Sequence, residues 1–482
     1  MKRLVLIALL LAAPCASQTR PARPAPPPAS KPAPVQPLTL GEVLASSARA
    51  APQIIEALAR VRQAEGRSLS AEGAFDTVFN VEGQSRLLGY YNGSVVEGRA
   101  TRPLTDNGGY VYGNYRLSSG TFPVYEDQAF TNRLGEVKVG ALYSLLRDRL
   151  IDERRARRTI AAADIDVARF EGEATAIGVQ ARAIAAYQQW VAAGLRLVAY
   201  RDLLSLAEER RSVIARQVQL GGQPRILLTE NDTNLVRRQG LVVRSEQEFA
   251  AAANALSLYL RDAEGRPVTV GVERLPPDAT GLQGLADVQA NGAVLRPDLD
   301  AILTRIDQSL VRLALAENDL KPRLDLRGEL GKDVGPEGAG GFTRTPTEAI
   351  VGFRFSVPLQ NRAAKGRVAE ARAEIDALRA RSGLIRDQIA IEVEGVRIAV
   401  DAAERLVDAA DQERRLAEEL AEAERRRFAL GTSSFFLVNQ REEAANDARL
   451  RLVDAQARIA GARADLAAAT ADRAALGLPA RP

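Results

Sequence analysis

The stretch Leu430-Gly431-Thr432-Ser433-Ser434 breaks, once, a run from Gln360 to Leu476 that contains no proline and consists mostly of Ala, Leu, Arg and Glu. These residue types are strong helix formers, whereas proline interrupts helices. Glycine suits the left-handed conformation that ends a helix, and Ser433 or Ser434 is able to cap the helix that follows. The sequence therefore predicts a long helical hairpin with its tip at Gly431.

A second hairpin of the same kind is predicted earlier in the chain. A proline-free run from Val124 to Gln223 ends at Leu220-Gly221-Gly222, and another helical stretch follows to about Arg261. A self-match at a fixed offset indicates a duplicated unit. The shift of 210 residues that carries Gly221 onto Gly431 also places Leu206-Ala207-Glu208-Glu209 on Leu416-Ala417-Glu418-Glu419, Arg216 on Arg426 and Leu227 on Leu437.

The composition argues against an enzyme and against nucleic-acid binding. The 482 residues include 65 basic and 61 acidic ones, and this net charge of +4 gives no strong field for nucleic acid. There is no histidine and Cys15 is the sole cysteine, which excludes zinc sites, Cys–His pairs and Ser-His-Asp triads. We identify no catalytic, cofactor-binding or metal-ligating residue, and an aromatic content of 5% fits long packed helices.

Residues 1–18 are predicted to be a secretory signal peptide, because Lys2-Arg3 precedes a short apolar run from Leu4 to Ala13. Cys15 follows this run at the place where a bacterial lipoprotein is cleaved and acylated, although Pro14 stands where the lipobox has a small residue. Lipidation of Cys15 and cleavage a few residues beyond it both remain open. The proline-rich residues 19–37 are predicted to be an extended tether.

Each copy is also predicted to contain two strands. Residues 75–82 and 137–143 in the first copy, and 324–330 and 351–357 in the second, alternate between apolar and polar or small side chains. A Gly- and Tyr-rich segment separates the first pair. It is interpreted as a hydrophilic loop or as an outward loop with an aromatic belt, and residues 110–117 are able to extend the strands. In the last strand we expect Val351, Phe353, Phe355 and Val357 to face lipid.

Each copy should therefore run helix, strand, loop, strand, very long helix, tip and return helix. The first copy is assigned to residues 38–261 and the second to 293–475, with an irregular connection over 262–292 and a C-terminal tail over 476–482. Four open strands have exposed edges, and lipid cannot satisfy free backbone groups, so several protomers must close the sheet. Three protomers would give twelve strands.

These features resemble the TolC-like outer-membrane efflux proteins, or outer membrane factors, over about residues 38–475. The resemblance rests on Leu38-Thr39-Leu40-Gly41-Glu42-Val43-Leu44 with Pro52, Leu295-Arg296-Pro297-Asp298-Leu299, Phe355-Ser356-Val357-Pro358-Leu359, and the tip from Arg427 to Ser434 followed by Leu437, Asn439 and Gln440. It implies a mainly α fold with a small β portion: a homotrimer whose four strands per protomer form a 12-stranded barrel in outer-membrane lipid, above a periplasmic α-barrel. The implied function is the exit duct of a tripartite efflux pump or type I secretion system.

The resemblance also implies roles for the tips, which in this family dock on a periplasmic adaptor that leads to an inner-membrane transporter. The docking residues here would be Leu220, Gly221, Gly222, Leu430, Gly431, Thr432 and Ser433. In members with an acidic ring at the periplasmic aperture, the acids lie six and nine residues after the tip glycine. The positions six residues after the two tip glycines hold Leu227 and Leu437, and those nine residues after them hold Glu230 and Gln440. Only Glu230 keeps a carboxylate. Glu230 is interpreted equally as a residue of the aperture and as a solvated helix residue.

Two other functions remain as alternatives. A periplasmic adaptor also has a long coiled-coil hairpin. It has a single hairpin, however, which lies between lipoyl-like and barrel domains, whereas this chain is predicted to have two hairpins and no such flanking domains. A structural coiled-coil envelope protein would leave the four amphipathic strands and the signal peptide unexplained. Carboxylates such as Glu208 and Glu418 are interpreted as solvated helix faces that pair with nearby arginines.

Overall fold

The computed structural model describes residues 36–277, 282, 296–338, 344 and 346–481. The predicted signal peptide, Cys15, most of the proline-rich tether and part of the 262–292 connection lie outside the described residues. Residues 1–36 and 37–482 form separate units, and the description that follows concerns the second unit.

The first copy contains the helices and strands expected, together with two further strands. Thr39 caps α1, because its Oγ1 accepts a hydrogen bond from the Glu42 N–H at 3.2 Å, and α2 starts at Pro52, where a missing N–H costs nothing. The elements are α1 (Leu40–Ala50), α2 (Pro52–Glu72), η1 (Gly73–Phe75), β1 (Val78–Ser85), β2 (Ser94–Pro103), β3 (Tyr110–Ser119), η2 (Val124–Ala129), β4 (Glu136–Ser144), α3 (Glu153–Gln219) and α4 (Arg225–Leu256).

The second copy has the predicted order of elements. After η3 (Val272–Arg274) come α5 (Pro297–Asn318), β5 (Arg323–Asp333), β6 (Glu348–Ser356), α6 (Arg362–Ala429) and α7 (Phe435–Ala469). α3 and α6 contain 67 and 68 residues, so each extends for about 100 Å at ~1.5 Å per residue. The apolar core lies where α1, α3, α4 and α7 meet, around the fully buried Trp190.

The first long helix begins later than its composition predicts. We expected it from about Leu145, but α3 starts at Glu153. Asp148 adopts a left-handed conformation with φ of +67°, which interrupts helical geometry. Asp152 then caps the helix by accepting hydrogen bonds from the N–H groups of Arg154 and Arg155 at 2.8 and 3.2 Å.

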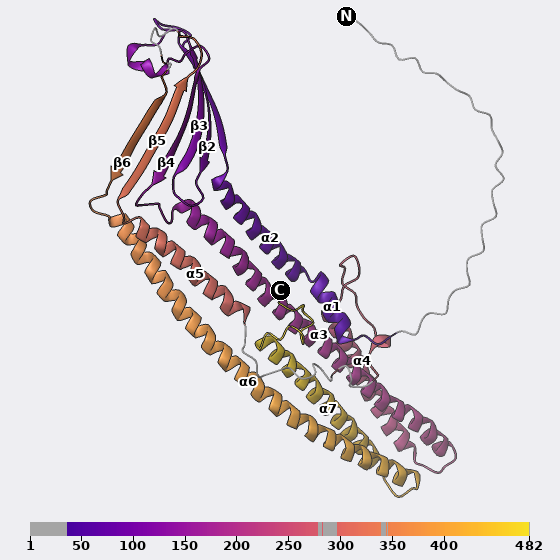
Figure 1. Ribbon diagram of the computed structural model, residues 1–482. Helices are drawn as coiled ribbons and strands as arrows, with labels where there is room; N and C mark the ends of the chain where they lie inside the picture. The colour runs from indigo at the N-terminus through magenta and orange to yellow at the C-terminus, as the bar shows by residue number, and fades with distance from the viewer. Residues whose placement is uncertain (1–35, 278–281, 283–295, 339–343, 345, 482) are drawn as a thin grey trace, which may run out of the picture. The chain divides into compact units, whose positions relative to one another are not determined.

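Both predicted turns are present, and the two tips lie at the end of the helices remote from the sheet (Figure 1). Gly221 and Gly431 have φ of +75° and +74°, the left-handed conformation that glycine adopts without strain. Ser434 is the cap of α7, since its Oγ accepts a hydrogen bond from the Leu437 N–H at 3.3 Å.

The prediction of four strands was wrong, because the described residues form one antiparallel sheet of six strands in the order β1-β2-β3-β4-β5-β6. The additional hairpin, β2–β3, occupies most of the Gly- and Tyr-rich segment interpreted as a loop, of which only residues 110–117 were expected to extend the strands. The alternation of bulky apolar and polar residues in β2–β3 was weak. Three positions of the apolar face hold small residues instead, namely Gly98, Ala100 and Gly113. The boundary of β1 also differs, since Phe75 ends η1 and the strand begins at Val78.

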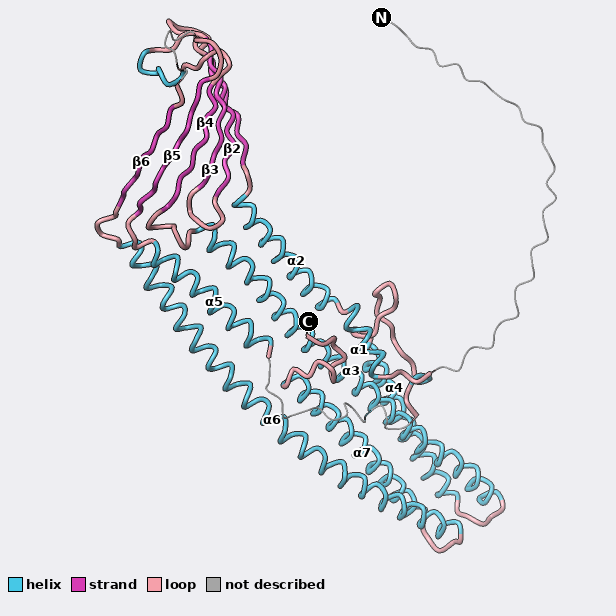
Figure 2. Tube along the Cα trace, viewed as in Figure 1, coloured by secondary structure: helices cyan, strands magenta, loops and turns pink. Residues whose placement is uncertain are grey.

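The sheet continues from one end of a row of helices (Figure 2). In that row α2 packs on α3, α3 on α5, and α5 on α6. β1 follows α2, β4 leads into α3, β5 follows α5 and β6 leads into α6. Among the helices that the structure describes, none is long and apolar enough to cross a bilayer.

Candidate functional site

The strand register sorts the side chains of the sheet onto two chemically different faces. Directly paired residues of antiparallel strands point the same way, and successive residues alternate. Within the six strands, the charged residues of the apolar face are Arg102 and Lys332, each next to a strand end. The exposed large side chains of that face are Phe79, Val81, Val96, Val111, Tyr115, Leu117, Val137, Val139, Tyr143, Leu326, Leu330, Val351, Phe353 and Phe355.

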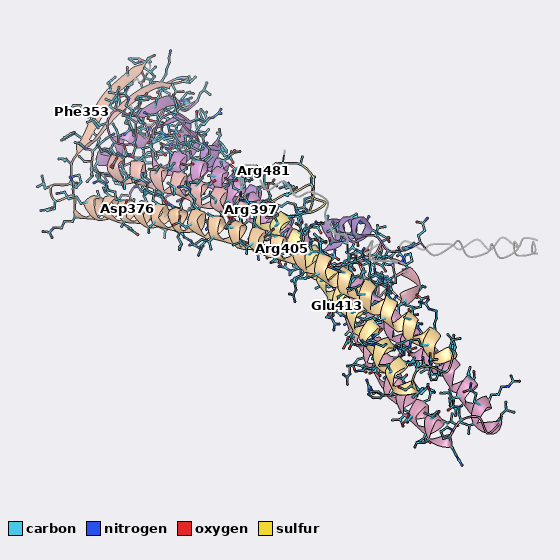
Figure 3. The ribbon with its side chains drawn as sticks, turned by 90° about the horizontal axis from the view of Figure 1, so that it is seen from below. Phe353, Asp376, Arg397, Arg405, Glu413 and Arg481 are labelled. Carbon is cyan, nitrogen blue, oxygen red and sulfur yellow. The ribbon has the colours of Figure 1, made fainter. Side chains whose placement is uncertain are left out.

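This apolar face includes three of the four residues predicted to face lipid. Val351 and Phe353 on β6 are 79% and 77% exposed, and Phe353 lies on the sheet, away from the tips (Figure 3). Phe355 shares their face, while Arg354 and Ser356 point to the other side. Val357 lies just beyond the end of β6. A continuous exposed apolar face of this extent marks a surface that contacts lipid or another protein.

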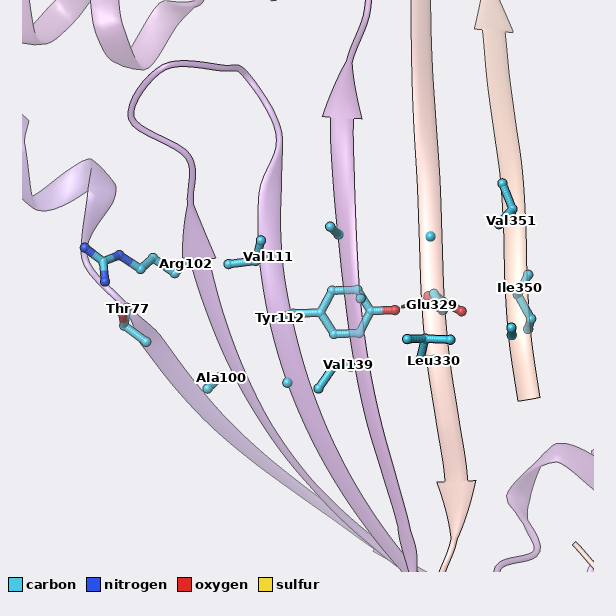
Figure 4. Close-up of a pocket in the computed structure, with 15 residues that line it drawn as sticks. Thr77, Ala100, Arg102, Val111, Tyr112, Val139, Glu329, Leu330, Ile350 and Val351 are labelled. Carbon is cyan, nitrogen blue, oxygen red and sulfur yellow. Dashed lines mark hydrogen bonds between the residues drawn. The ribbon is translucent and has the colours of Figure 1, made fainter. Parts of the chain in front are cut away.

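The opposite, polar face carries a network of paired charges. Glu136 accepts hydrogen bonds from Arg116 at 2.6 Å and forms an ion pair with Lys138 at 3.2 Å. The side chain of Tyr112 extends from β3 across Gly140 on β4, and its hydroxyl donates a hydrogen bond to Glu329 on β5 (Figure 4). These residues line a hollow of about 710 Å³. A Cβ at Gly140 would lie 2.6 Å from the tyrosine ring, so glycine is required there. Apolar-out and polar-in strands are the pattern of transmembrane barrels.

The residues predicted to dock an adaptor lie at the two tips. Leu220 and Leu430 are each 79% exposed. A Cβ built on Gly221 or Gly431 meets no atom within 4 Å, so their positive φ, rather than a lack of space, is what favours glycine. Thr432 donates from its Oγ1 to a backbone carbonyl at 3.0 Å. Gly222 and Ser433 complete the two turns.

Comparison with known proteins agrees with this architecture. Residues 293–472 match the family described as outer membrane efflux protein. The match covers less than half of the chain and lies within the residues predicted to form the second copy. No curated protein matches the sequence significantly.

Solved outer-membrane channels share the fold of this chain. The Campylobacter jejuni channel CmeC is 14% identical with a TM-score of 0.60, over 89% of this chain and 85% of that one. Vibrio cholerae VceC is 14% identical with a TM-score of 0.60, over 89% and 95%. The open-state channel MtrE of Neisseria gonorrhoeae is 15% identical with a TM-score of 0.60, over 91% and 89%. At this low identity the likeness concerns the fold, which the described residues share with these outer-membrane channels.

Of the four aperture candidates predicted from the sequence, the structure brings two together. Glu230 on α4 and Gln440 on α7 line one groove of about 410 Å³ between the two hairpins, with Arg237 and Glu443. Phe436, also in this groove, is 74% exposed. Leu227 and Leu437 are half-buried on the first turn of each return helix and do not line the groove.

Sequence reasoning missed a buried ionic cluster that joins the two helical hairpins. Arg238 on α4 is 1% exposed; its Nη1 donates to the Leu203 carbonyl at 2.6 Å and its Nη2 to Glu442 on α7 at 3.3 Å. Arg210 on α3 pairs with the same carboxylate and donates to Asn439 at 2.7 Å. Burial lowers the pKa of Arg238, which makes the shared carboxylate essential to the charged form.

Nothing in the sequence marked this cluster. The 210-residue shift that aligns the two copies places Ala448 on Arg238, so the duplication gave no sign of it. Arginine and glutamate are also abundant on every long helix of this chain. Only their distance in the fold distinguishes the buried pairs from solvated ones.

Proposed function

We propose that this protein is the outer-membrane exit duct of a tripartite efflux pump or type I secretion system and works as a homotrimer. The observation that carries the proposal is the combination of a sheet with one apolar and one polar face and two exposed tips at the remote end of helices about 100 Å long. The sheet would lie in outer-membrane lipid, with Val351, Phe353, Phe355 and Val357 facing the lipid. The helices would reach across the periplasm toward an inner-membrane transporter.

The two tips would then dock on a periplasmic adaptor. Leu220 and Leu430 are the exposed apolar side chains at the turns, with Gly221, Gly222, Gly431, Thr432 and Ser433 around them. Small side chains at a turn leave the backbone open to a partner hairpin. Any change in the path of the chain at Gly431 should therefore disturb docking without reaching the sheet.

Gly431→Val tests docking, with Gly431→Asn as its matched control. Left-handed geometry costs a residue with a Cβ about 1–2 kcal/mol, and asparagine tolerates it better than a β-branched residue. We expect valine to abolish efflux in cells that supply the matching adaptor, asparagine to retain much of it, and both variants to form trimers. Normal efflux by Gly431→Val would remove the docking proposal, and recovery of wild-type protein as a soluble monomer would remove the channel proposal.

The periplasmic aperture is proposed to be held by apolar and arginine-mediated contacts, with Glu230 as the one carboxylate among the four aperture candidates. Single-channel recordings should accordingly show at most weak cation selectivity. Strong cation selectivity that disappears in Glu230→Gln would contradict this and assign the aperture to an acidic ring.

A further inference from the structure

The sheet of one protomer has six strands. We propose that three protomers together form an eighteen-stranded barrel, in which β1 of each protomer pairs with β6 of the next. This inference rests on the trimer proposed above and adds its pore size and the surfaces through which the copies join. The partner at each sheet edge is a second copy of this chain. An eighteen-stranded wall requires that β2–β3 belongs to the sheet along its whole length and that the two sheet edges are complementary.

The β2–β3 hairpin is locked into the sheet at the end nearer the helices. The side chain of Asn107, fully buried in the 104–109 turn, donates to the Ser144 carbonyl and accepts from the Ser144 N–H, both at 2.9 Å. From the first turn of α3, Arg154 donates to the Gly108 carbonyl at 2.7 Å and Arg155 to the Asp106 carbonyl at 2.7 Å. The hairpin is therefore held by the same helix that follows β4.

The far end of the hairpin is fastened as well. After η2, the Thr131 N–H donates a hydrogen bond to Ser118 Oγ of β3 at 2.8 Å. Asn92, before β2, accepts from the Thr121 N–H at 2.9 Å. Every residue of β2 pairs with β3, and β3 pairs in turn with β4. The hairpin is thus continuous with the wall at both ends.

The hairpin also has the two-faced chemistry of its neighbours. Val96, Val111 and Tyr115 continue the apolar face, while Arg99 and Asn114 continue the polar one. A hairpin lying in the lumen or outside the barrel would have no reason to keep this alternation in register with β1 and β4. The side chains are those expected of strands between lipid and water.

The two sheet edges are complementary in direction and chemistry. β1 follows α2 and runs away from the helices, whereas β6 returns to them and leads into α6 (Figure 1). In the proposed barrel, β6 of one protomer would therefore lie antiparallel to β1 of the next. Both edges expose apolar side chains, with Phe79 and Val81 on β1 68% and 61% exposed and Val351 and Phe353 on β6 similarly open. Edge backbone groups without partners are not tolerated in lipid, which favours closure.

The width of the six-stranded sheet also fits the helices beneath it. Four helices packed ~9 Å apart, namely α2, α3, α5 and α6, extend over about 36 Å. Six strands spaced ~4.8 Å apart and tilted by ~40° occupy about 38 Å, whereas four occupy about 25 Å. Since barrel diameter grows nearly linearly with strand number, eighteen strands give a barrel about 1.5 times as wide as twelve.

The decisive experiment compares the wild type with a variant in which residues 86–135 are replaced by an Asn-Gly turn, which would join β1 directly to β4. Native mass spectrometry gives the number of copies, and electron cryomicroscopy in lipid nanodiscs gives strand number and diameter. We expect three protomers and eighteen strands for the wild type, and a barrel about 1.5-fold narrower for the variant. Should the variant fail to fold, the strand count of the wild type decides alone.

Disulfide formation provides an independent measurement in full-length protein carrying Cys15→Ser. Val81→Cys combined in turn with Ala349→Cys, Val351→Cys or Phe353→Cys covers neighbouring registers and should cross-link copies into covalent trimers for at least one pair. The control, Val81→Cys with Val139→Cys, should not cross-link, because two strands separate these residues by about 14 Å.

The alternative outcomes are distinguishable. The eighteen-stranded barrel would be overturned by two protomers that enclose twelve strands. It would equally be overturned by three protomers with a Val81–Val139 cross-link and β2–β3 outside the wall. A protein that stays monomeric in the membrane would overturn the proposed channel function itself.

Discussion

Glu442→Gln should loosen the two helical hairpins strongly, because it removes the one carboxylate that two arginines share. The side chains of Glu442 and Arg238 are 1% and 2% exposed, and that of Arg210 is 10% exposed. Glutamine leaves both guanidinium groups in place but removes the shared negative charge, and it replaces one of the two acceptor oxygens by an NH2 donor. Breaking one partner of a buried ion pair costs about 3–5 kcal/mol.

The cost should appear as faster amide hydrogen exchange in α4 and α7 around the cluster. Since each ~1.4 kcal/mol corresponds to a factor of ten, about 3–5 kcal/mol predicts an increase of a hundredfold or more in exchange that proceeds by local opening. Glu443→Gln is the matched control: its carboxylate pairs with Arg237 at 2.8 Å, but Arg237 is 61% exposed. Such a surface pair is worth about 0–1 kcal/mol.

A second variant separates charge from packing. Arg210→Met, Arg238→Met and Glu442→Leu together remove the entire cluster, and replacing a buried ionic set by apolar residues of similar volume is often neutral or stabilising. Exchange near wild-type rates in this triple variant would confirm that Glu442→Gln acts through uncompensated charge. Equal acceleration by Glu442→Gln and Glu443→Gln would refute the reasoning, because burial would then have no influence.

Three further outcomes are expected. Phe353→Arg places a charge on the lipid-facing side and should cost about 2–4 kcal/mol near the midplane, seen as a lower yield of trimer after membrane extraction, whereas Arg354→Ala should assemble nearly normally. Hydrogen bonds from Arg414 hold the pKa of Asp411 below its ordinary value, so its stabilising contribution is present above the unfolded pKa and is lost as the pH falls through the lower folded pKa. Asp411→Asn should therefore lower the urea midpoint at neutral pH, and the difference should vanish in strong acid. Radiolabelled palmitate should enter the wild type but not Cys15→Ser, with trimer assembly unchanged; an unlabelled wild type whose mature N-terminus lies beyond Cys15 would contradict this.

The helical part of the fold was predictable because its determinants are local. Gly431 and Ser434 act through the conformation and hydrogen bonding of the backbone next to them, and the structure shows both in the expected role. Thr39 and Pro52 act in the same local way where α1 and α2 begin. The start of α3 was missed for a local reason as well. Helix-forming composition continues before Glu153, but the left-handed Asp148 interrupts it.

The remaining features depend on residues far apart in the chain. β2 has glycine and alanine on much of its apolar face, and it is recognisable as a strand only once β1 and β3 lie beside it. The pairing of Arg238 with Glu442 joins positions 204 residues apart, and neither neighbourhood differs from a solvated helix face. Composition cannot distinguish a buried arginine–glutamate pair from a solvated one, because burial in this chain depends on which helix face packs against which partner.

The two predicted copies differ at both ends, and this bears on how the proposed trimer would work. At the sheet end, the described residues of the first copy form four strands and those of the second form two, so each protomer would supply a wide and a narrow arc of the barrel wall. At the tip end, Ser434 caps α7, but α4 follows Pro224 and has no side-chain cap. An uncapped helix start frays more readily, since its first N–H groups lack partners. Arg238 compensates by tying α4 to α3 and α7 through Leu203 and Glu442. The first tip is thereby held through the second hairpin, so a load applied to α7 by a docked partner would be transmitted to α4.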